Sequence, residues 1–199
     1  MDVFKVAIKR RSIRCFKDVP VPHEVLKGCV EAARLAPSGG NWQVLEYLVV
    51  DDNELLPLVF NNIRFGVRRQ AAEGEALPSD QPKAYIITLV NTTLEAKTSR
   101  GKNVTFYDIG LANENIMLVA WERGVGSCPI LWFDQEALKL VLEIPDNYEI
   151  GLVLALGYPD ENPVLDVFCD STGPWVDEKG ERHVPKRELR DIMHRNRFT

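Results

Sequence analysis

The sequence contains few cysteines and no excess of positive charge. Its four cysteines, Cys15, Cys29, Cys128 and Cys169, are too few and too scattered for a disulfide scaffold. No two of them form a Cys-x-x-Cys pair, so we expect no zinc site and no other metal. The 24 Lys and Arg residues against 29 Asp and Glu give a formal net charge of −5. This balance provides no global basic field, and we expect neither nucleic acid nor membrane as a partner.

Long apolar runs and internal repeats are also absent. No window approaches the roughly 18 apolar residues that a membrane span needs. The first residues, MDVFKVAIKRRSIR, contain no apolar segment ahead of a small-residue cleavage site, which argues against a secretory signal. The chain has 199 residues, 45% of them hydrophobic, which suffices for one substantial globular domain. We therefore expect a single domain over residues 1–199, located in the cytoplasm.

The spacing of apolar residues predicts that helices and strands alternate. Helices are predicted at residues 2–9, 22–36, 53–64, 105–123, 135–142 and 186–194. Strands are predicted at residues 44–50, 85–90 and 150–156. Residues 65–83 are charged and irregular, and they could form a lid. This alternation indicates a mixed α/β layered fold around one sheet.

Arginines cluster directly after the first predicted helix. Arg10, Arg11, Ser12 and Arg14 place three guanidiniums and a hydroxyl within five residues. Guanidinium forks suit phosphate oxygens, and the hydroxyl adds a further donor. The alternative is a solvated charged turn. A second basic pair, Lys186 and Arg187, follows Val184-Pro185 at the predicted start of the last helix, where a bound anion would offset cations that oppose the helix dipole. This pair too could be a solvated helix start.

Two glycine-containing segments offer backbone to a ligand. In Pro37–Gln43, Ser38-Gly39-Gly40-Asn41 reads as a turn in which both glycines are free to adopt positive φ and a planar ligand can come close. The segment Gly124–Ile130 follows the long predicted helix, and its N–H groups could face a ligand. Ordinary alternatives are a plain helix-to-strand turn with Trp42 in the core, and a capped helix end followed by a strand.

These segments, in this order, resemble the nitroreductase family of flavoproteins. The resemblance is carried by RRSIR, APSGGNWQ, ERGVGSCPI and LGYP, and the closing VPKRELRDIMHRNRF is similar to one branch of the family. It covers nearly the whole chain apart from residues 52–83 and 160–180. It implies an α+β fold, a three-layer α/β/α sandwich with a mixed, mostly antiparallel central sheet. It also implies non-covalent FMN and an intertwined homodimer whose subunits share each active site.

The resemblance implies the following cofactor contacts, position by position. Arg10, Arg11, Ser12 and Arg14 would hold the phosphate and ribityl chain, completed by Lys186 and Arg187. Pro37, Ser38, Gly39 and Asn41 would contact the isoalloxazine from the partner subunit. The backbone of Pro129, Ile130, Leu131 and Trp132 would lie against the ring, with an N–H near Leu131 donating to flavin N5. Further contacts would come from Asn61, Asn62, Arg68 or Arg69.

The chain departs from the family pattern at two places. Many members carry Pro-Trp where this chain has Val44-Leu45, and a small pair is common where it has Leu131-Trp132. These departures bear on the substrate more than on the cofactor. A bulky Trp132 would either narrow the pocket or reshape the face on which the substrate binds.

The resemblance implies an FMN-dependent NAD(P)H oxidoreductase that transfers hydride through flavin N5, by ping-pong kinetics, to a nitroaromatic, a quinone or a similar flat electrophile. No dedicated catalytic side chain is expected, and His23, His183 and His194 are interpreted as surface residues. Arg14 is the candidate to stabilise the charge of the reduced ring. Two alternatives stay open: reductive dehalogenation like that of the iodotyrosine deiodinases, with residues 65–83 as lid, and flavin storage without efficient turnover.

Overall fold

The computed structural model describes residues 2–65, 81–98, 102–167 and 171–198, and the chain divides into two units, Met1–Asp160 and Glu161–Thr199. Each unit is described by itself. Most of the lid expected at residues 65–83 lies outside the described residues, as does Cys169. The assignment of residues 1–199 to one domain stays a prediction.

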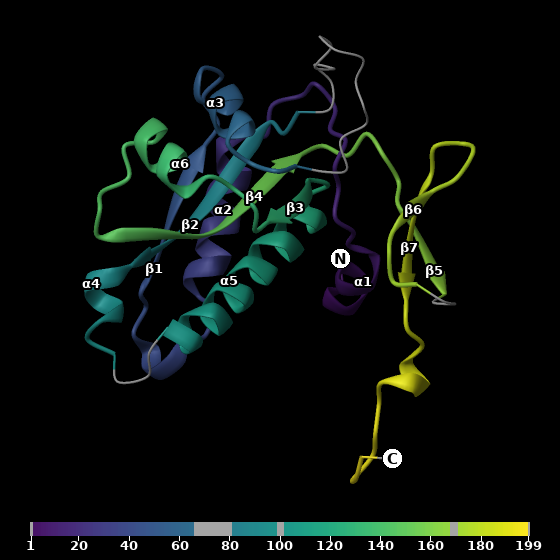
Figure 1. Ribbon diagram of the computed structural model, residues 1–199. Coiled ribbons are helices and arrows are strands. Elements are labelled where there is room, and N and C mark those ends of the chain that lie inside the picture. The colour runs from purple at the N-terminus through teal and green to yellow at the C-terminus, as the bar shows by residue number, and fades with distance from the viewer. Residues whose placement is uncertain (1, 66–80, 99–101, 168–170, 199) are drawn as a thin grey trace. The chain divides into compact units, whose positions relative to one another are not determined.

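A four-stranded antiparallel sheet forms the centre of the first unit (Figure 1). Its strands are β1 (Leu45–Val50), β2 (Ala84–Asn91), β3 (Gly126–Ile130) and β4 (Tyr148–Gly157), in the order β1-β2-β4-β3. The predictions of strands at 44–50, 85–90 and 150–156 are confirmed. The two central strands, β2 and β4, are almost continuously buried because both of their faces are covered.

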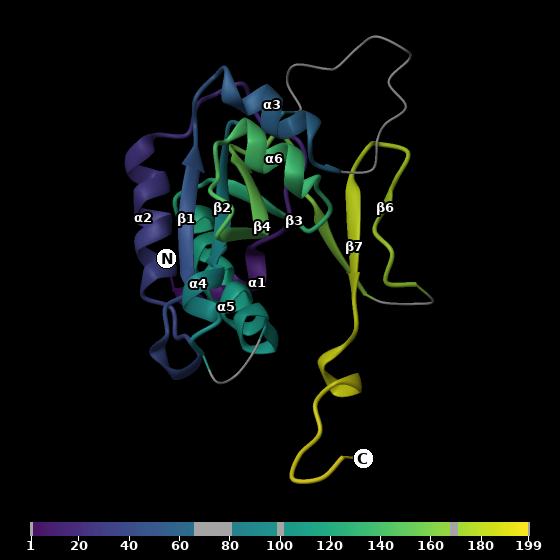
Figure 2. The ribbon, with the colours of Figure 1, turned by 60° about the vertical axis from the view of Figure 1, so that its left-hand side comes forward.

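Helices cover both faces of this sheet (Figures 1 and 2). On one face, α2 (His23–Arg34) and α5 (Lys102–Glu122) pack against Ile86 and Leu154. On the other, α3 (Leu55–Asn61) and α6 (Gln135–Val141) pack against Tyr85 and Val153. Adjacent strand residues thus enter two separate cores, as the alternation of side chains along a strand requires. The predicted three-layer α/β/α sandwich is confirmed.

Two short helices complete the first unit. The helix α1 (Val3–Lys9) was predicted, whereas the four-residue helix α4 (Thr92–Glu95) was not. Asn91 caps α4, its side chain accepting a hydrogen bond from Leu94 N at 3.1 Å. Within the described ranges, no helix combines the length and apolar character needed to cross a membrane.

The second unit is built around a small three-stranded sheet. Its strands β5 (Val164–Val167), β6 (Trp175–Val176) and β7 (Arg182–Lys186) lie in the order β5-β7-β6, with β5 parallel and β6 antiparallel to β7. The helix predicted at 186–194 was wrong, because only a 3₁₀ turn at Leu189–Asp191 follows β7. Pro185 restricts the preceding residue to extended backbone, and the apolar side chains of the tail are exposed, so no packing stabilises a helix there.

Candidate cofactor site

The basic segment lies against strand β3 as α1 ends. The Arg10 N–H caps α1 by donating to Val6 O at 2.9 Å. Ile13 is fully buried, and its N–H donates to Ser127 O at 3.0 Å, while Ser12 forms a parallel bridge with Ser127. Since side chains alternate along an extended segment, burying Ile13 turns its two neighbours away from the core. The chain thus holds its cations along the edge of β3.

The Arg10 side chain contacts a carboxylate, whereas the Arg11 side chain donates to two backbone carbonyls. Arg10 Nε lies 3.3 Å from Glu114 Oε1, an ion pair without hydrogen-bond alignment. Arg11 donates through Nη1 to the carbonyls of Ile8 and Arg10, at 2.9 and 2.7 Å. Desolvation, together with the charge of Arg10, lowers the pKa of Arg11 below its ordinary value. An anion would relieve both effects.

Three buried polar atoms in this region have no hydrogen-bond partner among the described residues: Arg10 Nε, Arg11 Nε and Ser127 Oγ. A buried polar atom that makes neither a hydrogen bond nor an ion pair carries a free-energy penalty of about 1–3 kcal/mol, which applies to Arg11 Nε and Ser127 Oγ, whereas Arg10 Nε has its ion pair with Glu114. A phosphate group, with several acceptor oxygens and a negative charge, matches this set of donors. The residues present therefore fit the phosphate end of FMN.

The loop between α2 and β1 is held against the first part of α5. Gly39 N donates to Asp108 Oδ1 at 2.9 Å, and Gln43 N donates to Ser38 Oγ at 3.3 Å. Of the two glycines that are free to adopt positive φ, Gly40 does so, with φ of 63°. Gly39 is needed for a different reason, because a Cβ there would overlap Val104. Trp42, expected in the core, is 43% exposed.

A groove of about 390 Å³ opens beside this loop. Its volume lies at the lower end of the range for small-molecule pockets. The polar side chains that line it include Arg34, Ser38, Gln43, Tyr47 and Asp108. Burial, and secondarily the charge of Asp108, raises the pKa of Tyr47 to about 12, so this phenol stays a neutral hydrogen-bond donor.

The end of β3 presents backbone and two exposed side chains. Ile130 is buried at 4% exposure, whereas Leu131 and Trp132 are each 71% exposed. The segment after α3 pairs with this region: Arg64 N donates to Trp132 O at 2.8 Å, and Asp134 N donates to Asn62 O at 2.9 Å. The Arg64 guanidinium carbon lies 5.7 Å from the centre of the Trp132 ring, a cation–π contact.

This pairing adds a residue that the sequence analysis missed. The Asn62 carbonyl accepts from Asp134 N, and its side chain donates to Leu58 O at 2.9 Å at the end of α3, so its flavin contact stays a prediction. Arg64 was not named, because its position depends on strand-like pairing with Trp132. Arg68 and Arg69 lie outside the described residues.

Lys186 and Arg187 belong to the second unit. Lys186 ends β7, and Arg187 Nη2 donates to Asp191 O at 2.8 Å. The argument from a helix N-terminus was therefore wrong, since no helix begins here. Their contribution to a phosphate site stays a prediction.

The basic segment and the Pro37–Gln43 loop contact different parts of the long helix α5. The basic segment reaches Glu114 in the middle of α5 and is joined to β3, whose end carries Ile130 and Trp132. The Pro37–Gln43 loop is anchored instead near the start of α5, at Asp108. Glu114 and Asp108 were not singled out, and Ser127 was named only as part of the segment Gly124–Ile130. A charged residue inside the long helix and the serine of Gly-Val-Gly-Ser were the available signals.

Comparisons with known proteins show the family of the chain. The model of the nitroreductase family matches residues 7–158. An Archaeoglobus fulgidus protein named as NADH dehydrogenase/NAD(P)H nitroreductase is 31% identical, over 80% of this chain and 87% of its own. An iodotyrosine deiodinase of Thermotoga neapolitana is 26% identical, over 80% of this chain and 89% of its own. The solved structure of an FMN-dependent nitroreductase from Clostridium difficile has a TM-score of 0.67 and 26% identity, covering 98% of this chain and 99% of that one. The chain belongs to the nitroreductase family.

Proposed function

We propose that the chain is an FMN-dependent NAD(P)H oxidoreductase that reduces a flat electrophile such as a nitroaromatic or a quinone. The observation that carries this proposal is a set of buried polar atoms that make no hydrogen bond among the described residues: Arg11 Nε, Ser127 Oγ and Arg10 Nε, the last of which forms an ion pair with Glu114. A phosphate would supply hydrogen-bond acceptors to this set. Bound FMN would supply the hydride chemistry between the nicotinamide donor and the acceptor. The family resemblance and the cofactor named for the C. difficile relative support the same assignment.

The chain's own residues would bind and orient the cofactor. Arg10, Arg11, Ser12 and Arg14 would hold the phosphate and ribityl chain, with Lys186 and Arg187 as further cations. The backbone from Pro129 to Trp132 would lie along the ring. Pro37, Ser38, Gly39 and Asn41 would contact the ring of the partner subunit's cofactor.

Trp132 and Leu131 would border the face on which the acceptor binds. Both side chains are exposed at the end of β3, and Arg64 lies against the Trp132 ring. An exposed aromatic side chain offers stacking to a flat substrate. The neighbouring guanidinium favours an acceptor that carries negative charge or a nitro group.

Two copies of the chain would build each site. Exposed apolar side chains on α5, Phe106, Tyr107 and Leu111, are 67%, 74% and 47% exposed. Tyr107 and Leu111 are four residues apart and share a helix face. A second copy of the chain is the occupant that we propose for this face.

Replacing Arg10 and Arg14 together by alanine tests the phosphate assignment. Each charge-assisted hydrogen bond contributes about 1.5–3 kcal/mol, so FMN affinity should fall more than about 100-fold. The variant should purify with little visible flavin absorbance. Lys5→Ala with Lys9→Ala, which removes two exposed cations from α1, should retain it. A folded Arg10/Arg14 variant that keeps its full flavin would show that the phosphate binds elsewhere.

Anaerobic addition of NADH or NADPH separates an oxidoreductase from a storage protein. If the proposal is correct, the visible flavin absorbance decreases with at least one of the two donors. A flavin that neither donor reduces would contradict turnover and favour storage.

Reductive dehalogenation is the second candidate function. The T. neapolitana relative, named iodotyrosine deiodinase, favours it at 26% identity. Supplying an iodotyrosine and a nitroaromatic in turn to the reduced enzyme distinguishes the two. Faster reoxidation by the iodotyrosine, with release of iodide, would favour the dehalogenase.

A further inference from the structure

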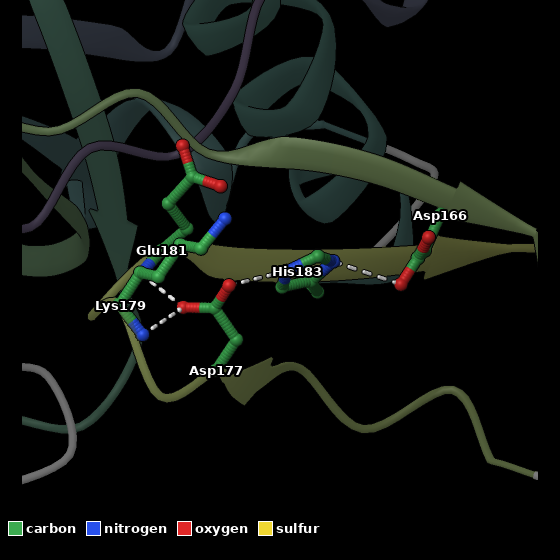
Figure 3. Close-up of polar contacts among 5 residues, drawn as sticks. All are labelled: Asp166, Asp177, Lys179, Glu181 and His183. Atoms are coloured by element: carbon green, nitrogen blue, oxygen red, sulfur yellow. Dashed lines mark hydrogen bonds and ion pairs between the residues drawn. The ribbon is translucent and has the colours of Figure 1, made fainter.

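A cluster of metal-binding side chains lies in the second unit, apart from the residues assigned to the cofactor. Asp177 and Glu181 come from the turn between β6 and β7, and His183 comes from β7 (Figure 3). One potential ligand atom from each of the three lies within 4.8 Å of the others. The spacing of the cysteines could not predict this cluster, because the cluster contains no cysteine.

The turn holds Asp177 in a fixed orientation. Its Oδ1 accepts hydrogen bonds from the N–H groups of Lys179 and Glu181, at 2.9 and 2.8 Å. Gly180, with φ of 82°, allows the chain to close this turn. With Oδ1 engaged, Oδ2 is left on the side of His183, as Figure 3 shows.

His183 is held from its other side by Asp166. His183 Nδ1 lies 3.0 Å from Asp166 Oδ2 on the neighbouring strand, and the Trp175 ring stacks on the imidazole at 4.0 Å and 12°. A carboxylate beside Nδ1 favours the tautomer with the proton on that atom, leaving the lone pair on Nε2. A carboxylate behind a metal-bound imidazole is the usual arrangement at such sites.

The Nε2 atom faces the two carboxylates without a hydrogen bond. It is buried, it has no hydrogen-bond partner among the described residues, and it lies 3.6 Å from Asp177 Oδ2. That separation is too long for a hydrogen bond, but it is close to the distance of about 3.3 Å between two ligand atoms on one tetrahedral zinc ion. The Glu181 side chain is exposed and within 4.8 Å of the other two, so it would complete three ligands.

The charge of the cluster agrees with a cation. The side chains of Asp177 and Glu181 supply two carboxylates, whose charge can balance that of one divalent ion. An imidazole ligand favours zinc and neighbouring transition metals over magnesium and calcium, which prefer oxygen ligands throughout.

We propose that Asp177, Glu181 and His183 bind one divalent transition-metal ion of the zinc class, with Asp166 orienting the imidazole. The site is structural, because the sheet it joins has little core of its own: Leu165 and Val176 are 53% and 50% exposed. A metal that binds residues of the turn and β7 stabilises such a small sheet. The site does not depend on the flavin function.

Titration of the chelator-treated full chain with ZnCl₂, followed by calorimetry, tests the proposal. We expect one Zn²⁺ per chain, and a tetrahedral-type visible difference spectrum when CoCl₂ replaces ZnCl₂. His183→Ala should abolish this binding, and Asp166→Asn should weaken it about 10- to 100-fold. Zinc should also raise the melting temperature of the wild type but not of His183→Ala.

Glu181→Gln keeps the test decisive if the His183 variant fails to fold, since the Glu181 side chain is exposed. It should weaken zinc binding at least about tenfold, while Glu178→Gln in the same turn and His194→Ala in the tail leave it unchanged. No stoichiometric binding of Zn²⁺ or Co²⁺ would overturn the proposal and leave His183 as an ion-pair partner of Asp166 and Asp177. Full binding by folded His183→Ala or Glu181→Gln would overturn it equally.

Discussion

At the scale of the residue, burial controls the chemistry of Cys29. This side chain lies on the buried face of α2, and desolvation raises the pKa of its thiol from an ordinary 9.0 to about 11, although the charge of Arg123 acts in the opposite direction. The thiolate is the reactive form of cysteine. Cys29 is therefore a packing residue.

Alkylation of the native protein should leave Cys29 almost unmodified. A pKa of about 11 makes the thiolate fraction at about pH 8 roughly 100-fold lower than a pKa of 9.0 would. Peptide mapping by mass spectrometry after iodoacetamide treatment measures this, and the same treatment in a denaturing concentration of urea provides the control. Rapid native labelling of Cys29 would contradict its burial.

Residue-scale pairing inside the core was not predictable from the sequence. Asn113 Nδ2 donates to Thr88 Oγ1 and to Ile109 O, both at 2.9 Å, and both side chains are buried. Two polar residues 25 positions apart satisfy each other only because α5 packs on β2. His183 was similarly misjudged as a surface residue; its side chain is 16% exposed because Trp175 and Asp166 lie against it.

At the scale of the element, a glycine in β3 sets the position of the basic segment. A Cβ at Gly126 would lie 2.6 Å from Ile13 Cγ1 and 3.1 Å from Pro159 Cγ. Ile13 sits between Ser12 and Arg14, so the close approach of this segment to β3 positions the predicted phosphate contacts.

Gly126→Ala should therefore impair both stability and cofactor binding. Overpacking costs about 1–3 kcal/mol of unfolding free energy, and displacing Ile13 moves its neighbours. Urea unfolding and flavin content per chain measure the two effects. In Gly151→Ala, the added Cβ would lie 2.7 Å from Ile109 Cδ1, so this control should lose stability without losing flavin. If the two variants contained equal amounts of flavin, the packing of Ile13 against β3 would not affect cofactor binding, and the prediction would be contradicted.

At the scale of the whole molecule, the proposed site requires two chains. Tyr107→Asp with Leu111→Asp places charge on the exposed face of α5 and should convert the dimer to monomer, with loss of flavin. Leu140→Asp makes the same chemical change at an 82% exposed leucine of α6 and should leave the dimer intact. Light scattering coupled to gel filtration, with flavin absorbance recorded on the same peak, measures both. A wild-type monomer that retains flavin would exclude the shared site.

The sequence by itself determined the family, the order of the main helices and strands, and the segments that could bind a cofactor. Apolar runs such as residues 85–90 identify buried strands because a strand covered on both faces needs apolar side chains throughout. Likewise, the arginines of Arg10–Arg14 indicate an anion-binding segment, because a guanidinium can bind an anion whatever the distant parts of the chain do.

Only the tertiary structure decided which residues meet across long sequence separations. Glu114 beside Arg10, Asp108 at Gly39 and Arg64 on Trp132 each depend on how helices and strands pack, which local spacing does not encode. The tail was mispredicted for the same reason: a helical pattern forms a helix only when its apolar face is buried, and β7 pairs with β5 and β6 instead. The cluster of Asp166, Asp177 and His183 likewise exists because that pairing brings three strands together.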